Sequence, residues 1–431
     1  MKKNKFIIST LILIIGGFLT KVLGMVIKIF MTRIVGTEGI GLYMLVNPTF
    51  MLCIAICTLG LPTAISKLVS ENKRNNKKLV SSATLIAIVI NIALMITVIL
   101  SAKFISNNLL HERRSYYSII SIGLVLPFIS ISSILRGYFF GREKTIPHVL
   151  SNVLEDVTRL ISIILFTPFF LTKGLEAAVS FLILSNIISE LTSIFVLFFF
   201  LPKNFKLKKD DLKPTLSNIK DIMNISLPTT ATRLIGTIGM FFEPIILTYF
   251  LLKNGYSNDF IISEYGILNG YVMPLILLPS FFTGAISQAL LPIVSNNFAN
   301  KRKEYVNKKV KQAILLSLLI GVPATIIFIT IPNIPLKLIY NTTKGINYIK
   351  VLAPICLLHY IQSPLTSTMQ AMGLSSKAMF GTLVGMILRT VTLIICCNLN
   401  IGLWGLVIAS GINIFYVTIH HIIYVRKHLK N

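Results

Sequence analysis

The sequence predicts an all-α integral membrane protein with about twelve transmembrane helices. Of its 431 residues, 54% are hydrophobic and only 13% are charged, and the mean hydropathy is +0.79. Soluble domains carry about 25% charged residues, so the composition excludes an ordinary soluble enzyme. Long apolar runs recur along the whole chain, and no loop between them is long enough to fold as a domain.

Twelve segments are long enough to cross a bilayer, since a transmembrane helix needs roughly 20 mostly apolar residues. They cover 6–31, 41–66, 79–102, 116–140, 149–171 and 175–201, followed by 221–252, 264–294, 311–332, 347–372, 377–398 and 401–425. The first segment follows a basic start that resembles a signal peptide. However, its apolar run continues past Phe30 without a small-residue cleavage site, so we expect a retained helix.

Basic residues in the loops predict the orientation of the chain. With the amino terminus on the cytoplasmic side, 26 of the 41 Lys and Arg residues fall in inner segments and nine in outer segments. This bias follows the positive-inside rule and places both termini in the cytoplasm. The formal net charge of +26 is therefore explained mainly by topology, including the basic run at 301–303, and we expect no nucleic-acid partner.

The chain divides into two halves of similar length. A basic stretch at 204–220 separates a predicted amino-terminal lobe, 1–203, from a carboxy-terminal lobe, 221–431. The sequence TKVLG at 20–24 resembles TRLIG at 232–236, near the start of each half. Two pseudo-symmetric six-helix lobes with a site between them are a recurrent plan of transporters.

Six basic residues remain inside the predicted spans. Each costs roughly 2.5–3.5 kcal/mol at a helix centre, so we expect these residues to face a polar interior. Five are candidates for a cationic, substrate-binding cavity: Lys21, Lys28, Arg136, Arg233 and Arg389.

Position refines this set. Lys21 and Lys28 are two helical turns apart, so they share one helix face with Gly24, and Arg233 repeats the position of Lys21 in the second lobe. Two alternatives stay open, because Lys28 is close enough to a helix end to snorkel and Arg136 could simply follow the topology rule.

Acidic residues inside the spans are fewer. Glu155 and Arg159 have the i, i+4 spacing of an on-helix ion pair, which favours a structural role. Glu243, directly before Pro244, and Glu190 are candidates for a counter-charge or a coupling-ion site. The sequence shows no catalytic motif, metal-ligand spacing or cofactor loop, so we expect no enzyme activity, metal or cofactor.

Several segments resemble a known family. They are GFLTKVLG at 17–24, RIVGTEGIGLY at 33–43, LGLPTAISK at 59–67 and LRGYFFGR at 135–142. Together they resemble the stage V sporulation protein B branch of the polysaccharide-transporter family, in the superfamily that includes MATE exporters and lipid II flippases. The resemblance implies a two-lobed, V-shaped bundle in the bacterial cytoplasmic membrane. It also implies flipping of an undecaprenyl-linked glycan precursor, with spore-cortex peptidoglycan as the implied pathway.

The sequence departs from that family in two respects. Many relatives have fourteen helices, whereas twelve are predicted here, so a groove built by the last two would be absent. Lipid II flippases carry essential arginines on the first helix, whereas this chain has Lys21. Lysine supplies charge but lacks the planar fork that contacts a phosphate through two hydrogen bonds.

Three functional hypotheses follow. The first is an alternating-access flippase for a lipid-linked sugar pyrophosphate, driven by the membrane potential or by Na⁺ or H⁺. The alternative is a cation-coupled MATE-type multidrug exporter, which would need acidic residues in the amino-terminal lobe. A third is a scaffold that assembles cell-wall synthesis proteins without transporting anything.

Overall fold

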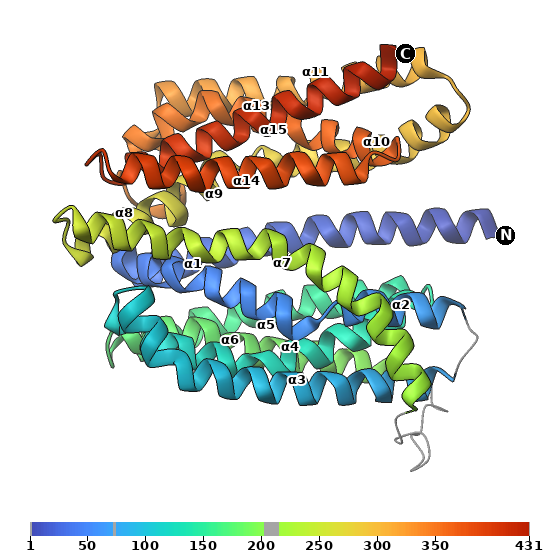
Figure 1. Cartoon of the computed structure of the whole chain (residues 1–431), viewed down its shortest axis with the longest axis horizontal. Coiled ribbons are helices and arrows are strands. Elements are labelled where there is room, and N and C mark those ends of the chain that lie inside the picture. Colours follow the sequence, from blue (N-terminus) through green and yellow to red (C-terminus); the bar gives the residue numbers. More distant parts are fainter. Residues whose placement is uncertain (1, 72–74, 202–214, 431) are drawn as a thin grey trace. The chain divides into compact units, whose positions relative to one another are not determined.

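The computed structural model describes residues 2–71, 75–201 and 215–430. Every regular element within these ranges is a helix, which confirms the predicted all-α class (Figure 1). Eight of the helices are long and apolar enough to cross a membrane, or nine if a bent pair counts as one span. Each of the twelve predicted segments coincides with helix, although some are merged or broken.

The chain forms two compact units, Met1–Pro244 (unit 1) and Ile245–Asn431 (unit 2). Their boundary lies inside one continuous helix, α7, Leu216–Lys253. The sequence instead suggests a linker at 204–220, of which 204–214 lie outside the described residues. The predicted lobe boundaries therefore stay a prediction.

Unit 1 contains six further α-helices and two short helical segments. They are α1 (Lys2–Thr58), α2 (Leu61–Glu71), α3 (Asn76–Phe104), the π-helix η1 (Ile105–Leu109), the 3₁₀-helix η2 (Arg113–Ser115), α4 (Tyr116–Gly141), α5 (Thr145–Leu171) and α6 (Leu175–Phe199). The first part of α7 completes the unit.

Two glycines shape the start of unit 1. Gly36 has φ 70° and ψ −169°, so α1 consists of two helices joined at a kink, as the separate spans 6–31 and 41–66 predict. The second of these helices is itself broken, because Leu59 and Gly60 have φ of 43° and 60° before α2 begins. A Cβ on Gly60 would lie only 3.0 Å from the Ser226 carbonyl oxygen of α7, so the break also needs a residue without a side chain.

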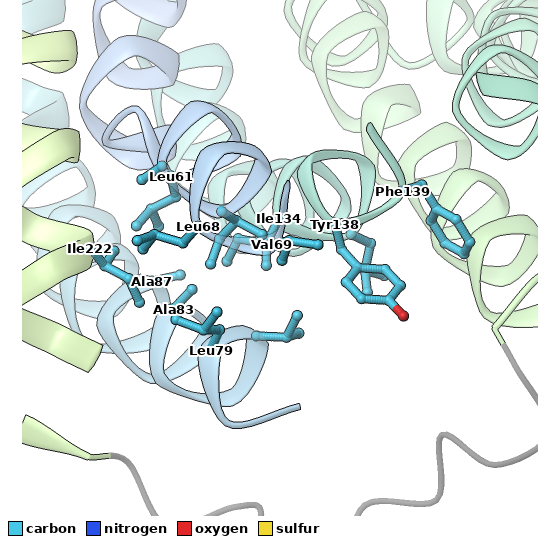
Figure 2. Close-up of a cluster of buried hydrophobic side chains, with 14 of the residues drawn as sticks. Leu61, Leu68, Val69, Leu79, Ala83, Ala87, Ile134, Tyr138, Phe139 and Ile222 are labelled. Atoms are coloured by element: carbon cyan, nitrogen blue, oxygen red, sulfur yellow. The ribbon is translucent and has the colours of Figure 1, made fainter. Parts of the chain in front are cut away.

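A hydrophobic cluster in unit 1 joins α2, α3, α4 and α7 (Figure 2). It contains Leu61 and Leu68 from α2, Leu79 from α3, Ile134 from α4 and Ile222 from α7. All but Leu68 are at most 1% exposed. This packing fixes the beginning of α7 to unit 1.

The helices α2 and α4 approach each other at two glycines. A Cβ on Gly137 would lie 2.6 Å from the Pro62 carbonyl oxygen, and one on Gly141 would lie 2.5 Å from that of Ser66. Both contacts are with backbone, which cannot move away as a flexible side chain can. Small residues at i and i+4 are a common device for close helix packing in membranes.

Unit 2 begins with the end of α7. It continues with α8 (Asn258–Gly266), the π-helix η4 (Ile267–Val272), α9 (Met273–Ile276), α10 (Ser280–Ala299), α11 (Lys303–Thr330), α12 (Asn333–Tyr340), α13 (Ile346–Ala371), α14 (Ser375–Cys397) and α15 (Trp404–Lys430). The short helix α12 is absent from the predicted segments, because eight residues are too few to cross a bilayer.

The predicted span 264–294 is a broken helix, bent by 51° between Ile276 and Ser280. Pro279 lies in the break, directly before α10 begins at Ser280. A continuous helix would need a backbone N–H at this position, and proline has none. The Tyr360 hydroxyl of α13 is fully buried and donates a hydrogen bond to the freed Ile276 carbonyl oxygen. The polar backbone at the break is thereby satisfied inside the protein, as a membrane interior requires.

We expect Gly137→Ala and Gly141→Ala each to destabilise the protein by about 1–3 kcal/mol, because the added methyl group overlaps backbone atoms. The measurement is thermal unfolding of the purified protein in detergent. Gly17→Ala is the control, since a Cβ there meets nothing within 4 Å. Equal stability of all three variants would contradict the close packing of α2 on α4.

We expect Tyr360→Phe to lower the free energy of unfolding by about 1–3 kcal/mol, because it leaves the Ile276 carbonyl without its buried donor. Tyr249→Phe on α7, whose side chain is 52% exposed, is the matched control and should change little. The same unfolding measurement checks both variants. A free energy of unfolding that Tyr360→Phe leaves unchanged would argue against this hydrogen bond.

Candidate functional site

Most of the intramembrane charges of unit 1 fall into two groups. One is a buried network of arginines and carboxylates shared by α4, α5 and α6. The other consists of basic residues on α1 and α7, the first helix of each sequence half. The two groups differ in exposure and in the charge of their partners, so they are suited to different roles.

In the buried network, the Arg136 guanidinium on α4 lies between two carboxylates. Its Nη2 pairs with Glu155 of α5 and lies 3.1 Å from Glu190 Oε2 of α6. The same nitrogen donates a hydrogen bond of 2.8 Å to Ser193 Oγ. Arg136 therefore ties three helices together.

Arg159 extends this network along α5. Its Nη2 lies 2.6 Å from Glu155 Oε1, and its Nη1 lies 3.7 Å from Asp156 Oδ1. The i, i+4 ion pair that the sequence indicates is thus present, but Glu155 also serves a second arginine. Arg159 donates a further hydrogen bond of 3.3 Å to Ser189 Oγ on α6.

The network is buried at Glu155 and Glu190, partly buried at its other charged members, and nearly balanced in charge. Glu155 is 7% exposed and Glu190 is 4% exposed. Three carboxylates face two guanidinium groups, so the formal charge is −1. Pairing and hydrogen bonding are what make such a group tolerable in a low-dielectric interior.

Sequence reasoning proposed Arg136 for the cationic cavity, whereas the structure neutralises it with Glu155 and Glu190. Glu190 accordingly lies where a counter-charge is needed. Ser189 and Ser193 were missed, although their positions beside Glu190 and one turn after it could have indicated a polar face of α6.

On α1, Lys21 is exposed, and Lys28, two turns later, is partly buried. Gly24 lies between them, and a Cβ added there would meet nothing within 4 Å. Packing therefore does not explain this glycine, in contrast to Gly137. It leaves open space next to Lys21.

The repeated position on α7 has the same character. Arg233 is exposed, and Gly236, one turn later, also faces open space. Arg233 Nη1 lies 3.3 Å from the Thr58 hydroxyl oxygen, directly before the break between α1 and α2. Its described partner is therefore a neutral group rather than a carboxylate.

Two candidates lie outside these groups. Arg389 is partly buried on α14 and belongs to unit 2. Glu243 is partly buried on α7, directly before Pro244 at the end of unit 1. In the described part of the chain, no cluster of three or more His, Cys, Asp or Glu residues could hold a metal ion.

The architecture is that of a MATE-type membrane protein. An inward-facing multidrug resistance MATE family transporter of the MOP superfamily superposes with a TM-score of 0.73 at 16% identity, covering 95% of this chain and 94% of that one. A MOP superfamily transporter from Pyrococcus furiosus, described as having a binding pocket of reverse polarity, gives 0.62 at 15% identity, covering 98% and 95%.

The chain belongs to the polysaccharide biosynthesis protein family, whose model matches residues 7–298, and a MatE model matches 237–395. It is 34% identical to stage V sporulation protein B of Bacillus subtilis strain 168, over 99% of this chain and 85% of the relative. It is 22% identical to the lipid II flippase MurJ of the same organism, over 95% and 79%. The family predicted from the sequence is confirmed, and the chain is a multi-pass membrane protein.

We expect Arg136→Gln to destabilise the protein by about 3–5 kcal/mol, because it removes the ion pair of the buried Glu190 and leaves Glu155 with one guanidinium partner instead of two. Glu190→Gln should cost less, since it leaves two carboxylates facing two guanidinium groups. Thermal unfolding in detergent measures both. Lys103→Gln, at an exposed position, is the control. A larger destabilisation by Glu190→Gln than by Arg136→Gln would contradict this charge balance.

Proposed function

We propose that this protein is a flippase that moves an undecaprenyl-linked, anionic glycan precursor across the bacterial cytoplasmic membrane by alternating access. The observation that carries the proposal is the contrast within unit 1. Its partly buried arginines, Arg136 and Arg159, are paired with carboxylates, whereas Lys21 and Arg233 are exposed beside glycines that face open space. Exposed cations next to open space suit an anionic ligand.

The relatives support this substrate class. One carries the name lipid II flippase, and another, stage V sporulation protein B, covers nearly the whole chain. A lipid-linked sugar pyrophosphate combines a polyprenyl tail, which the bilayer accepts, with a charged group that it does not. The residues of a carrier therefore have to lower the cost of moving that group through the hydrocarbon region.

The chain's own residues suggest how. Lys21 supplies a compact point charge, and the Arg233 guanidinium supplies a fork that contacts a phosphate through two hydrogen bonds. Gly24 and Gly236 leave room for the ligand beside each cation. No bond is formed or broken, so the process needs only binding, a change of access and release.

The energy source in this proposal is the membrane potential or a gradient of Na⁺ or H⁺. Moving one elementary charge across 100 mV is worth about 2.3 kcal/mol, which suffices to bias the return of a cationic carrier. Glu243 and Glu190 stay candidates for a coupling-ion site. With the termini in the cytoplasm, cell-wall synthesis proteins would be neighbours of the transporter.

The alternative, a MATE-type drug exporter, has less support. A cationic drug needs a carboxylate that it can approach, but Glu155 and Glu190 are buried and paired with Arg136. Lys21 would repel such a substrate. The fold does not decide the matter, because a fold relative is itself described as having a binding pocket of reverse polarity.

We expect Lys21→Ala and Arg233→Ala each to slow flipping roughly 10–100-fold, since a hydrogen bond to a charged group is worth about 1.5–3 kcal/mol. The double variant should be inactive. The measurements are complementation of a bacterium that lacks its own flippase, and transfer of a fluorescent undecaprenyl-pyrophosphate sugar across reconstituted vesicles.

Lys21→Arg should retain activity, and Lys103→Ala, at an exposed position on another helix, is the matched control. Full activity with both cations removed would exclude this mechanism. Unchanged complementation combined with absent lipid transfer would instead favour the scaffold hypothesis.

A further inference from the structure

Basic residues from three separate segments meet at one end of unit 2. We call this surface the basic end; it consists of Lys301, Arg302, Lys308, Lys311, Lys377, Arg426 and Lys427. They belong to the α10–α11 connection and the start of α11, to the start of α14 and to the end of α15. Figure 1 shows the carboxy-terminal end of α15 close to the beginning of α11.

A buried cluster holds these segments together. Val306 and Val310 of α11, Ala378 of α14 and Val425 of α15 pack against one another with at most 4% exposure. The basic residues follow or precede these positions by a few residues at most. Their convergence is therefore a product of the fold, whereas the positive-inside rule concerns only the side of the membrane.

The seven side chains are exposed, and none of them forms an ion pair in the described part of the chain. The neighbouring Lys309 behaves differently, because its Nζ donates to Gln312 Oε1 at 3.1 Å and lies over the Tyr305 ring. Glu304 is the single acidic residue in these segments. Within these segments the basic end thus presents seven positive charges against the single carboxylate of Glu304.

Lys301 has a conformation that usually selects glycine. It lies in the left-handed region, with φ 59°, after the last turn of α10. Its N–H bonds the Phe298 carbonyl, and the N–H of Arg302 bonds that of Asn297. The helices α7 and α13 end in the same arrangement, but with Gly255 and Gly373 at this position. A residue with a side chain is disfavoured there, although Glu143 takes the same position after α4, with φ 56°.

Exposed apolar side chains adjoin the cations on each helix. Leu315, 59% exposed, follows Lys311 by one turn, and Phe380, 58% exposed, follows Lys377 by three residues. On α15, Ile423, 57% exposed, precedes Arg426 by three residues. A cation next to exposed apolar surface on three helices matches the border between hydrocarbon and headgroups, and a soluble anion would not need the apolar part.

We propose that the basic end binds the anionic headgroups of phospholipids in the adjacent leaflet and thereby fixes the depth of unit 2 in the membrane. Phosphodiester groups would replace the acidic partners that the protein does not supply. Each basic residue near an anionic membrane surface contributes to such binding, and salt weakens the attraction. The proposal does not depend on the transported substrate.

The test is thermal unfolding of the full-length protein in neutral maltoside detergent with added dioleoyl phosphatidylglycerol or dioleoyl phosphatidylcholine. We expect phosphatidylglycerol to raise the Tm and phosphatidylcholine to have little effect, and the difference should shrink in high salt. A variant carrying Lys308→Gln, Lys311→Gln, Lys377→Gln and Arg426→Gln should lose more than half of the phosphatidylglycerol-dependent shift.

The matched control carries Lys103→Gln, Lys253→Gln, Lys337→Gln and Lys344→Gln, four exposed lysines outside the basic end, and should keep the full shift. The proposal would be overturned if both variants lost the phosphatidylglycerol-dependent shift equally, or if neither variant lost any of it. So would soluble pyrophosphate that reproduces the whole shift, because the surface would then bind a free anion rather than a lipid.

Lys301→Gly separates folding from binding. It suits the left-handed backbone, so the Tm in neutral detergent should stay equal or rise. The phosphatidylglycerol-dependent shift should nevertheless decrease, because one cation is lost. An unchanged or larger shift would contradict a role for this lysine in headgroup binding.

Discussion

The absence of water in the hydrocarbon region is the constraint on which the rest of this structure depends. Backbone groups there have to be satisfied within the protein, so only helices form in the described residues, and even the breaks have polar partners. Asn91 and Ser130 donate to the Cys57 carbonyl near the break before α2, and Tyr360 donates to that of Ile276 in unit 2. The same constraint explains why Arg136 lies between Glu155 and Glu190, because a charge left without a partner in a low-dielectric interior is strongly destabilising.

Glycine has two opposite uses in unit 1. At Gly137 and Gly141 the missing side chain lets the backbone of α2 come into contact with α4, so these glycines serve packing. At Gly24 and Gly236 the missing side chain leaves space that no described residue fills, one turn after a basic residue in each case. The repeat of Lys21 with Gly24 and Arg233 with Gly236 indicates that both halves retained the same feature, although packing does not require it.

The sequence predicted most of the fold because hydrophobicity along a helix is a local property. Spans such as 79–102 and 116–140 coincide with α3 and α4, and the i, i+4 spacing was enough to find the Glu155–Arg159 pair. It could not predict that Arg136 pairs with Glu190, 54 residues away, because a partner on another helix depends on how helices pack. The segment 264–294 was predicted as one span and the short helix α12 was missed for a similar reason, since a hydropathy window averages over a break and ignores eight-residue elements.

The charge balance also decides which cations can serve a ligand. A diphosphate that bound Arg136 would have to displace Glu155 and Glu190. Glu155 would keep its pair with Arg159, but the buried Glu190 would lose its ion pair, and further negative charge would be added beside it. The desolvation penalty of a stranded carboxylate is several kcal/mol, more than a hydrogen bond to the ligand supplies. At Arg233 the exchange is different, because the group to be displaced is the neutral hydroxyl of Thr58. An anion can take that place and strand no charge. Reversible binding and release therefore favour the exposed cations of α1 and α7, whereas the buried network, whose partners cannot be exchanged cheaply, holds α4, α5 and α6 in a fixed arrangement.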